Sequence, residues 1–280
     1  SELPQRATRR TKHDAILSSI VTTSRSEIGA VTSLGRLIRL TPVDLPVVPE
    51  NSIQLAAGVR IADYLAVDAK KERVLALVSL TAPEAIAIGT RQGVVKRLTP
   101  GDWANRSEFE IISLKPGDSV VGVQQSAETD ELLFVTSEAQ LLHFPASSVR
   151  PQGRSAGGMA GINLGSTATV IFFGAVDPRA EVVVATVSTS SATIAGMETG
   201  RAKVSALSEF PGKGRATGGV RAHSFLKGED QLSAAWAGTA PALAVGTDGA
   251  VRSLPDAGAR RDSSGTALDG LVGSIGSPIR

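Results

Sequence analysis

Apolar stretches alternate along the chain with short polar turns, and this combination recurs five times. Each copy consists of an apolar stretch, a turn of small or polar residues, and a second apolar or basic stretch. The copies span residues 30–40, 87–98, 133–144, 193–204 and 244–254. Because glycine accepts the positive φ of tight turns and the flanking residues favour strands, each copy predicts a β-hairpin.

The turns recur at a period typical of propeller blades. They centre on residues 35, 93, 139, 200 and 249, so four intervals separate the first from the last and their mean is 53.5 residues. Helical solenoids have shorter periods. The sequence therefore predicts an all-β, propeller-like fold of five to six four-stranded blades, in which radial repetition protects the strand edges.

A second element lies between the hairpins. In three copies a Leu and a short polar turn precede the next apolar strand, as at residues 114–121, 164–171 and 226–232. Before it there is often a segment with Arg and paired Gly, as at residues 154–161 and 215–221, and residues 260–266 form a closing copy with one Gly. Residues 9–17 look like the second half of an earlier repeat. We therefore expect residues 1–280 to form a single domain whose N-terminal end is cut within a repeat.

Two stretches have an ambiguous local pattern. Residues 62–78 are the best helix candidate, since Ala-Lys-Lys-Glu-Arg favours helix. The register of the repeats instead makes residues 74–80 a strand, and we follow the repeat. We also expect residues 6–23 to pair into a blade and not to form a helix.

The composition restricts the class of protein. Lys and Arg total 29 against 27 Asp and Glu, which excludes a histone-like polycation but allows basic residues to gather on one face. The absence of Cys excludes disulfides, thiolate metal sites and Cys nucleophiles, and it fits a cytoplasmic protein. No apolar run approaches the ~20 residues of a membrane span, and residues 1–12 are not a signal peptide. With 42% hydrophobic and 4% aromatic residues, the core must be mostly Val, Ile, Leu and Ala.

Candidate catalytic and metal-binding residues are sparse. The single Tyr, Tyr64, has no basic cluster or carboxylate set around it in the sequence. The three His residues, His13, His143 and His223, are far apart, so we expect no metal site. No glycine-rich phosphate loop ends in Lys-Ser or Lys-Thr, so we expect no ATP site and no cofactor in this domain.

The repeated motifs resemble a known family. The hairpin Thr-x-x-Gly-x-Val-Lys-Arg-Leu at residues 90–98, the Arg-x-x-Gly-Gly segments, and the Leu-x-x-x-Asp turns at residues 114–118 and 226–230 are similar to the C-terminal domain of the A subunit of bacterial DNA gyrase and topoisomerase IV. The resemblance covers essentially the whole chain. It implies a β-pinwheel, a propeller-like ring in which neighbouring blades exchange strands.

The resemblance also implies a function and partners. The family domain binds and bends duplex DNA around its outer rim and presents it to the cleavage core of a type II topoisomerase. The implied partners are double-stranded DNA, the rest of the A subunit and the B subunit, with ATP and Mg used on other domains of a cytoplasmic enzyme. Type II topoisomerases cleave with a Tyr nucleophile, and we expect no such role for Tyr64.

Gyrase carries a basic, glycine-rich box, Gln-Arg-Arg-Gly-Gly-Lys-Gly, that supports full wrapping. Residues 152–161 keep the Gln, one Arg and the glycines but lack the Lys, and residues 213–221 form a second, more basic relative. This departure favours a topoisomerase IV-like or divergent gyrase-like subunit, and the choice between the two activities stays open.

The candidate DNA contacts are basic side chains and glycine pairs at recurring positions of the repeats. Arg forms bidentate bonds with phosphate, and glycine pairs expose backbone N–H groups to it. No acid lies between Ala139 and Val176. The predicted set is Arg9, Arg10, Lys12, Lys96, Arg97, Arg150, Gln152, Arg154, Gly157, Gly158, Arg201, Lys203, Lys213, Arg215, Gly218, Gly219, Arg221, Arg260 and Arg261.

Two other functions remain open at the level of sequence. A propeller scaffold for protein or glycan partners would bind on a flat face or in the central channel, whereas DNA needs a continuous positive band on the rim. A glycosidase-like propeller enzyme is a weaker third possibility, because no carboxylate recurs at a fixed position of the repeat.

Overall fold

The computed structural model describes residues 15–47, 59–194 and 197–278. Within these ranges the chain is built from strands, short 3-10 turns at Pro42–Asp44, Ala146–Ser148 and Leu207–Glu209, and the single helical turn α1 (Ile61–Tyr64). The predicted all-β class is confirmed. No helix in the described part of the chain has the length and apolar character needed to cross a membrane.

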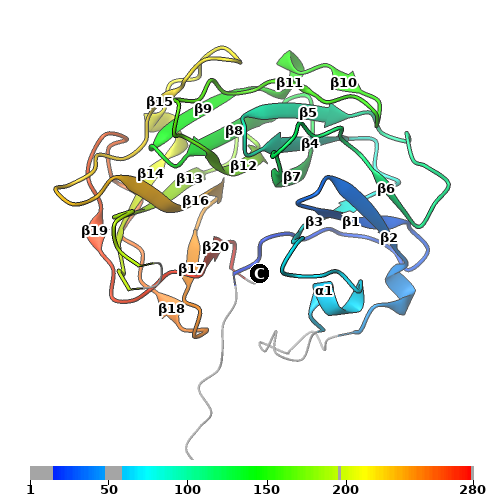
Figure 1. The fold of residues 1–280 in the computed structure, drawn as a ribbon, viewed down its shortest axis with the longest axis horizontal. Coiled ribbons are helices and arrows are strands. Elements are labelled where there is room, and N and C mark those ends of the chain that lie inside the picture. The colour runs from blue at the N-terminus through cyan, green and yellow to red at the C-terminus, as the bar shows by residue number, and fades with distance from the viewer. Residues whose placement is uncertain (1–14, 48–58, 195–196, 279–280) are drawn as a thin grey trace, which may run out of the picture.

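Five small sheets are arranged as blades around a ring (Figure 1). From its inner to its outer edge, blade 1 contains β3 (Val74–Ser79), β1 (Ile28–Thr32), β2 (Arg36–Leu40) and β6 (Glu108–Glu110). Blade 2 contains β7 (Val120–Ser126), β4 (Ala85–Thr90), β5 (Val94–Leu98), and on its outer edge β10 (Pro151–Gln152) and β11 (Met159–Ala160).

The remaining blades follow the same plan. Blade 3 contains β12 (Val170–Val176), β8 (Glu131–Thr136), β9 (Gln140–Pro145) and β15 (Val220–Arg221). Blade 4 contains β16 (Gln231–Thr239), β13 (Val182–Thr189), β14 (Arg201–Ala206) and β19 (Thr266–Ala267). Blade 5 contains β20 (Ser274–Gly276), β17 (Leu243–Val245) and β18 (Val251–Arg252).

Neighbouring blades exchange strands, as in a β-pinwheel. After the hairpin β4–β5 of blade 2, the chain returns to blade 1, where β6 pairs with β2, before β7 completes blade 2. In the same way β11, β15 and β19 each pair with the hairpin of the preceding blade. We call the four returning segments crossovers; they span residues 99–111, 145–162, 207–222 and 253–268. Each outer edge therefore belongs, in sequence, to the next repeat.

Four of the five predicted hairpins are present at the predicted residues; in blade 4 the first strand, β13, ends at Thr189, so the stretch from residue 193 expected to form it lies in the connection to β14. Gly35, Gly93, Gly200 and Gly249 have positive φ, and Ala139 takes the same conformation with a φ of 59°. The carbonyl groups of four turn residues also accept a hydrogen bond from the following crossover. The donors are the N–H groups of Ile111, Ile162, Ala222 and Leu268. The turn conformation therefore fixes the end of each returning outer strand.

The repeat predicted local structure better than helix propensity did. Val74–Ser79 is the inner strand β3, and the helical pattern survives only as α1. Of the N-terminal stretch expected to join a blade, residues 15–23 are described and contain no helix. Ile16 exchanges backbone hydrogen bonds of 2.8 and 3.0 Å with Ser277, next to β20. The two ends of the described chain therefore meet beside blade 5, and the number of blades is five, within the predicted range of five to six.

The core is a series of layers between adjacent blades. One cluster joins blades 1 and 2, including Val78, Ile86 and Ile88, and similar clusters join each later pair. The buried residues are mainly Val, Ile, Leu and Ala, as the composition predicted. The layer between blades 2 and 3 also contains Phe134, which packs against Phe173 with ring centroids 4.8 Å apart. Each blade is thus held chiefly by its neighbours.

Candidate nucleic-acid interface

The arginine- and glycine-containing segments lie in the crossovers, immediately before the outer strands of blades 2, 3 and 4. In each pair the second glycine lies against the neighbouring strand. Gly158 has a φ of +81°, and a Cβ there would lie 2.6 Å from the carbonyl oxygen of Val95. Gly219 has a φ of +75°, and its Cβ would overlap the carbonyl oxygen of Leu141. These glycines let the crossover approach the preceding blade closely.

This placement corrects part of the glycine prediction. The N–H of Gly158 donates to Oε1 of Gln152 at 3.1 Å, so both residues are used to close the loop between them. Gly219 is committed to backbone packing. The first glycine of each pair is different, because Gly157 and Gly218 are exposed to solvent. Only these two of the four paired glycines present their backbone at the surface.

Basic side chains follow the outer edges of blades 2, 3 and 4. Arg150, Lys213 and Arg221 are exposed, and their side chains have no polar partner among the described residues. Nη1 of Arg215 donates to the carbonyl oxygen of Ala160 at 2.6 Å, which joins the crossover of blade 3 to the edge of blade 2. Nη1 of Arg261 donates to the carbonyl oxygen of Arg221 at 3.4 Å, which joins the edges of blades 4 and 3.

Two further arginines on these edges lie next to a carboxylate. Arg154 bonds Asp102 through its backbone N–H at 2.8 Å and its Nε at 3.3 Å, and its guanidinium lies over the ring of Phe109. Arg260 is largely exposed, with its Nε 3.9 Å from Asp262. We call the seven basic side chains on these edges the rim set; they are Arg150, Arg154, Lys213, Arg215, Arg221, Arg260 and Arg261.

Three predicted contact residues are inside the protein. Lys96, Arg97 and Lys203 are each exposed by 2% or less. Nζ of Lys96 donates to the carbonyl oxygens of Ile111, Arg154 and Ala156 at 2.8, 3.0 and 2.7 Å. Nζ of Lys203 donates to those of Arg260 and Arg261. The expectation that these hairpin residues face a rim phosphate is wrong, because every strand position here is covered by a returning crossover.

Burial has a measurable electrostatic effect on the two lysines. Loss of solvation lowers the pKa of Lys96 to about 8 and that of Lys203 to about 8. Each ammonium group donates to backbone carbonyls of a crossover, and those hydrogen bonds favour the charged form. Near neutral pH both lysines are therefore charged, and their hydrogen bonds hold the crossover segments that carry Arg154, Arg260 and Arg261.

The residue at the fourth position after the hairpin turn also holds a crossover in place, a role that the sequence analysis did not predict. Nη1 of Arg97 donates to the carbonyl oxygens of Ala146 and Val149, at 3.2 and 3.0 Å. At the same position in blade 1, Arg39 donates to those of Ala104 and Arg106, each at 3.0 Å. The equivalent residue of blade 3 is His143. The recurring basic residue was visible in the repeat, but its burial depends on the strand exchange.

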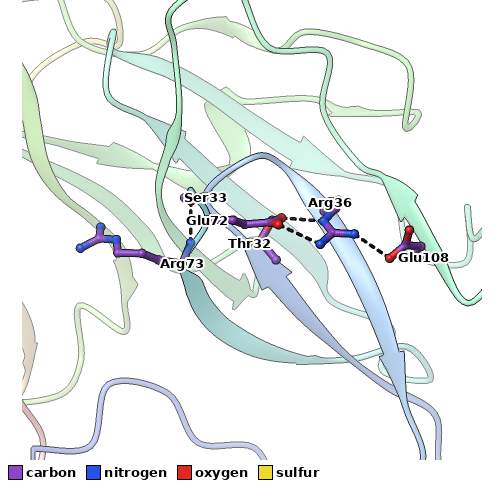
Figure 2. A network of polar contacts seen from close by, with 6 residues as sticks. All are labelled: Thr32, Ser33, Arg36, Glu72, Arg73 and Glu108. Atoms are coloured by element: carbon purple, nitrogen blue, oxygen red, sulfur yellow. Dashed lines mark hydrogen bonds and ion pairs between the residues drawn. The ribbon is translucent and has the colours of Figure 1, made fainter. Parts of the chain in front are cut away.

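The outer edge of blade 1 has a different charge. Its outer strand carries Glu108 and Glu110, and Arg36 lies between the carboxylates of Glu72 and Glu108 (Figure 2). Arg36 bonds Glu72 through Nε at 2.6 Å and Nη2 at 2.8 Å. The same contact lowers the pKa of Glu72, chiefly through the hydrogen bonds from Arg36. The rim set therefore lies on blades 2 to 4, and the outer strand of blade 1 is acidic.

The other predicted residues are accounted for individually. Arg201 is half-buried; its Nε donates to the carbonyl oxygen of Gly265 at 3.1 Å and lies 3.8 Å from Glu229. Arg9, Arg10 and Lys12 lie outside the described residues. Tyr64 lies on α1, with its hydroxyl 3.4 Å from the carbonyl oxygen of Asp44.

The histidines do not form a site together. His13 lies outside the described residues, and His223 is buried beside Thr186, with a pKa that burial lowers to about 4. Across the described ranges, no group of three His, Cys, Asp or Glu side chains is placed to hold a metal ion.

Comparison with known proteins agrees with this architecture. A family model described as "DNA gyrase C-terminal domain, beta-propeller" matches residues 130–177 and 198–235, which include the hairpin β8–β9 of blade 3 and strand β14 of blade 4. Over these residues the chain is therefore similar in sequence to the C-terminal domain of DNA gyrase. The resemblance predicted from the hairpin and glycine motifs is thus confirmed.

The similar proteins differ in how much of the chain they cover. The DNA gyrase A protein of Escherichia coli (strain K12) is 28% identical over 219 residues, covering 76% of this chain and 23% of that protein. The chain thus spans about a quarter of the length of the curated relatives it matches. A C-terminal domain of DNA topoisomerase IV superposes with a TM-score of 0.73 at 21% identity, over 90% of this chain and 79% of that one. A DNA gyrase A C-terminal domain gives 0.65 at 14% identity, over 98% and 93%.

Proposed function

We propose that the outer edges of blades 2 to 4 bind and bend duplex DNA. The observation that carries this proposal is the rim set, whose members are joined from blade to blade by the bonds of Arg215 to Ala160 and Arg261 to Arg221. The path is therefore made of linked segments and not of scattered surface charges. The acidic edge of blade 1 marks one end of it.

The mode of recognition follows from the elements present at this edge. The outer strands of blades 2 to 4 each have two residues, and the one described helix has four, so neither type of element offers a surface for reading bases in a groove. Arg and Lys side chains at a convex edge contact phosphates instead. The domain therefore binds the DNA backbone and selects, at most, sequences that bend easily.

The proposed role in the cell extends that of the relatives. The domain presents the bent duplex to the cleavage core of a type II topoisomerase, in the bacterial cytoplasm. Its other partners are the remainder of the A subunit and the B subunit, and the domain itself uses no cofactor. ATP and Mg act on other parts of the enzyme. Supercoiling and decatenation assays on the full assembly distinguish a gyrase activity from a topoisomerase IV activity.

The salt dependence of DNA binding tests the proposal. The logarithm of the affinity falls with the logarithm of salt by about 0.9 per phosphate neutralised, so seven contacts give a slope near −6. We expect this slope for duplexes of unrelated sequence, together with bending detected by FRET between the DNA ends. Lys213→Ala with Arg221→Ala removes about two contacts and makes the slope shallower by about 2.

Lys70→Ala with Lys71→Ala is a matched control, because both lysines are exposed and lie in the loop before β3, away from the outer strands. This control leaves the slope unchanged. A flat salt response, or strong selection of one sequence, contradicts the proposal and favours a scaffold for protein or glycan partners.

A further inference from the structure

The crossover that carries Lys213 and Arg215 is fastened to blade 3 by a histidine with two acceptors. Nδ1 of His143 lies 2.9 Å from a carboxylate oxygen of Glu131, and Nε2 lies 2.9 Å from the carbonyl oxygen of Phe210. The side chains of His143 and Glu131 are exposed by only 12% and 18%. The imidazole therefore sits in a defined, largely covered position between β8 and the crossover.

The identity of these acceptors determines the protonation of the ring. A carbonyl oxygen has no proton to give, so Nε2 must be the donor to Phe210. An ionised carboxylate also accepts only, so Nδ1 must be the donor to Glu131. A neutral imidazole has one N–H, whereas the imidazolium has two. Facing an ionised carboxylate and a carbonyl oxygen, both ring nitrogens are therefore assigned as N–H donors.

The repeat supports this assignment independently. The equivalent residues in blades 1 and 2 are Arg39 and Arg97, which are permanently charged. Each has the same two kinds of partner as His143, a Glu carboxylate and carbonyl oxygens of the crossover. In each of these three blades, the side chain at the fourth position after the turn bonds carbonyl oxygens of the crossover. In blades 1 and 2 this side chain is an arginine, and in blade 3 it is a histidine.

We propose that protonated His143 is a positioning residue for DNA binding, which holds the Lys213–Arg215 segment on the rim and releases it when the ring loses its proton. The inference rests on the proposed function of this edge. The ring reaches the crossover through Phe210, and the same segment also meets β9 through the backbone, since the N–H of Lys213 donates to the main-chain carbonyl oxygen of His143 at 3.2 Å. A Cβ at Gly212 would lie only 3.3 Å from Cε1 of the ring, so the segment passes close to the imidazole.

The charged groups around His143 come from two elements. Glu131 lies on β8, and the carboxylate of Asp130 beside it accepts from the N–H of Ala127. Glu209 and Lys213 lie on the crossover on either side of Phe210. Histidine is the side chain type whose ordinary charge changes between about pH 5 and 8. His143 is therefore the group whose titration alters the fastening in that range.

An NMR titration tests the protonation without DNA. The chain has three histidines, and His143→Gln identifies the signal. At pH 6 we expect both ring nitrogens of His143 to carry protons, and in Glu131→Gln the titration midpoint moves to lower pH because the carboxylate no longer stabilises the cation. A ring with one proton at pH 6, or a midpoint that Glu131→Gln leaves unchanged, overturns the proposal.

DNA binding at pH 6 and pH 8 tests the positioning. We expect the wild-type affinity to fall with pH by about tenfold more than that of His143→Arg, a difference of about 1.4 kcal/mol. His143→Arg restores the cation of blades 1 and 2 and keeps its affinity. An equal pH dependence in the two proteins overturns the proposal even where His143 is protonated.

Failure of the proposed function has a different signature. If neither protein binds DNA at any pH, the rim proposal is wrong, and amide exchange at Lys213 becomes the readout. The crossover then loses protection at pH 8 relative to His143→Arg, after correction for the intrinsic exchange rate. Equal protection contradicts the role of His143 in positioning. If His143→Arg does not fold, the same comparison is made between the wild type and Glu131→Gln.

Discussion

Replacing Lys96 by Met tests whether buried cations hold the crossovers. The ammonium group donates to three carbonyl oxygens, two of them in the segment of Arg154 and Ala156 and one at the end of β6. Met fills similar space without a donor. A buried acceptor that loses its partner costs about 1–3 kcal/mol, and removal of the desolvation cost of Lys offsets part of the total, so we expect a net loss of about 2–4 kcal/mol.

Urea denaturation measures this loss as a shift of the midpoint at constant slope. Lys71→Met is the matched control, because the side chain of Lys71 is 81% exposed, and it should change the free energy of unfolding by less than about 0.5 kcal/mol. A loss below about 1 kcal/mol in Lys96→Met would refute the reasoning. The ammonium would then be replaceable by water or by relaxation of the crossover, and the strand exchange would need another explanation for its stability.

Two further predictions use the same crossovers. The pKa of Lys96 is about 8 in the folded chain against 10.5 for a free lysine. Between these pH values the unfolded chain therefore binds more protons at Lys96 than the folded chain does. The contribution of Lys96 to the free energy of unfolding consequently rises from pH 8 to pH 10.5, by up to about 3 kcal/mol. The difference in unfolding free energy between wild type and Lys96→Met should change over that range by this amount, and a constant difference contradicts the effect of burial. Gly219→Ala should cost at least about 2 kcal/mol more than Gly228→Ala in urea denaturation; both glycines have positive φ, but only a Cβ at Gly219 meets backbone. Equal losses would show that conformation alone, and not close approach, selects glycine there.

The sequence predicted the repeat, the hairpins and the turns because these depend on local chemistry. Apolar periodicity and turn residues located all five turns, including Ala139, where no glycine is present. The repeat also predicted strand β3 and not a helix, because register with the other copies outweighed the helix propensity of Lys70 and Lys71. Local signals of this kind are independent of which blade a strand finally joins.

The candidate site was predicted less well, for a reason specific to strand exchange. A basic residue three or four positions after a hairpin turn is expected to face outward in an isolated sheet. Here the next repeat sends a segment back over it, so Lys96, Arg97 and Lys203 are buried, while Lys213 and Arg221 on the returning segments are exposed. The sequence alone does not show which strand covers which. The recurrence of a basic residue at the fourth position after the turn is the one sequence signal of this role, and its meaning depends on knowing the strand exchange.

The buried and exposed cations have complementary effects on the proposed DNA path. An exposed Arg on a free loop attracts phosphate, but the loop follows the duplex and cannot impose a bend. Bending 20–30 base pairs costs on the order of 1–6 kcal/mol, and the protein must resist the same force. In blades 2 and 4 that resistance comes from Lys96 and Lys203, which bind the carbonyl groups of Arg154, Arg260 and Arg261 directly. In each of these two blades, a buried lysine thus holds the backbone of the arginines on the rim.

In blade 3 Leu142 replaces the lysine, so this edge depends on His143 and on the bond of Arg215 to Ala160. The proposed role of His143 therefore predicts that a change in pH between about 5 and 8 alters the DNA path at blade 3.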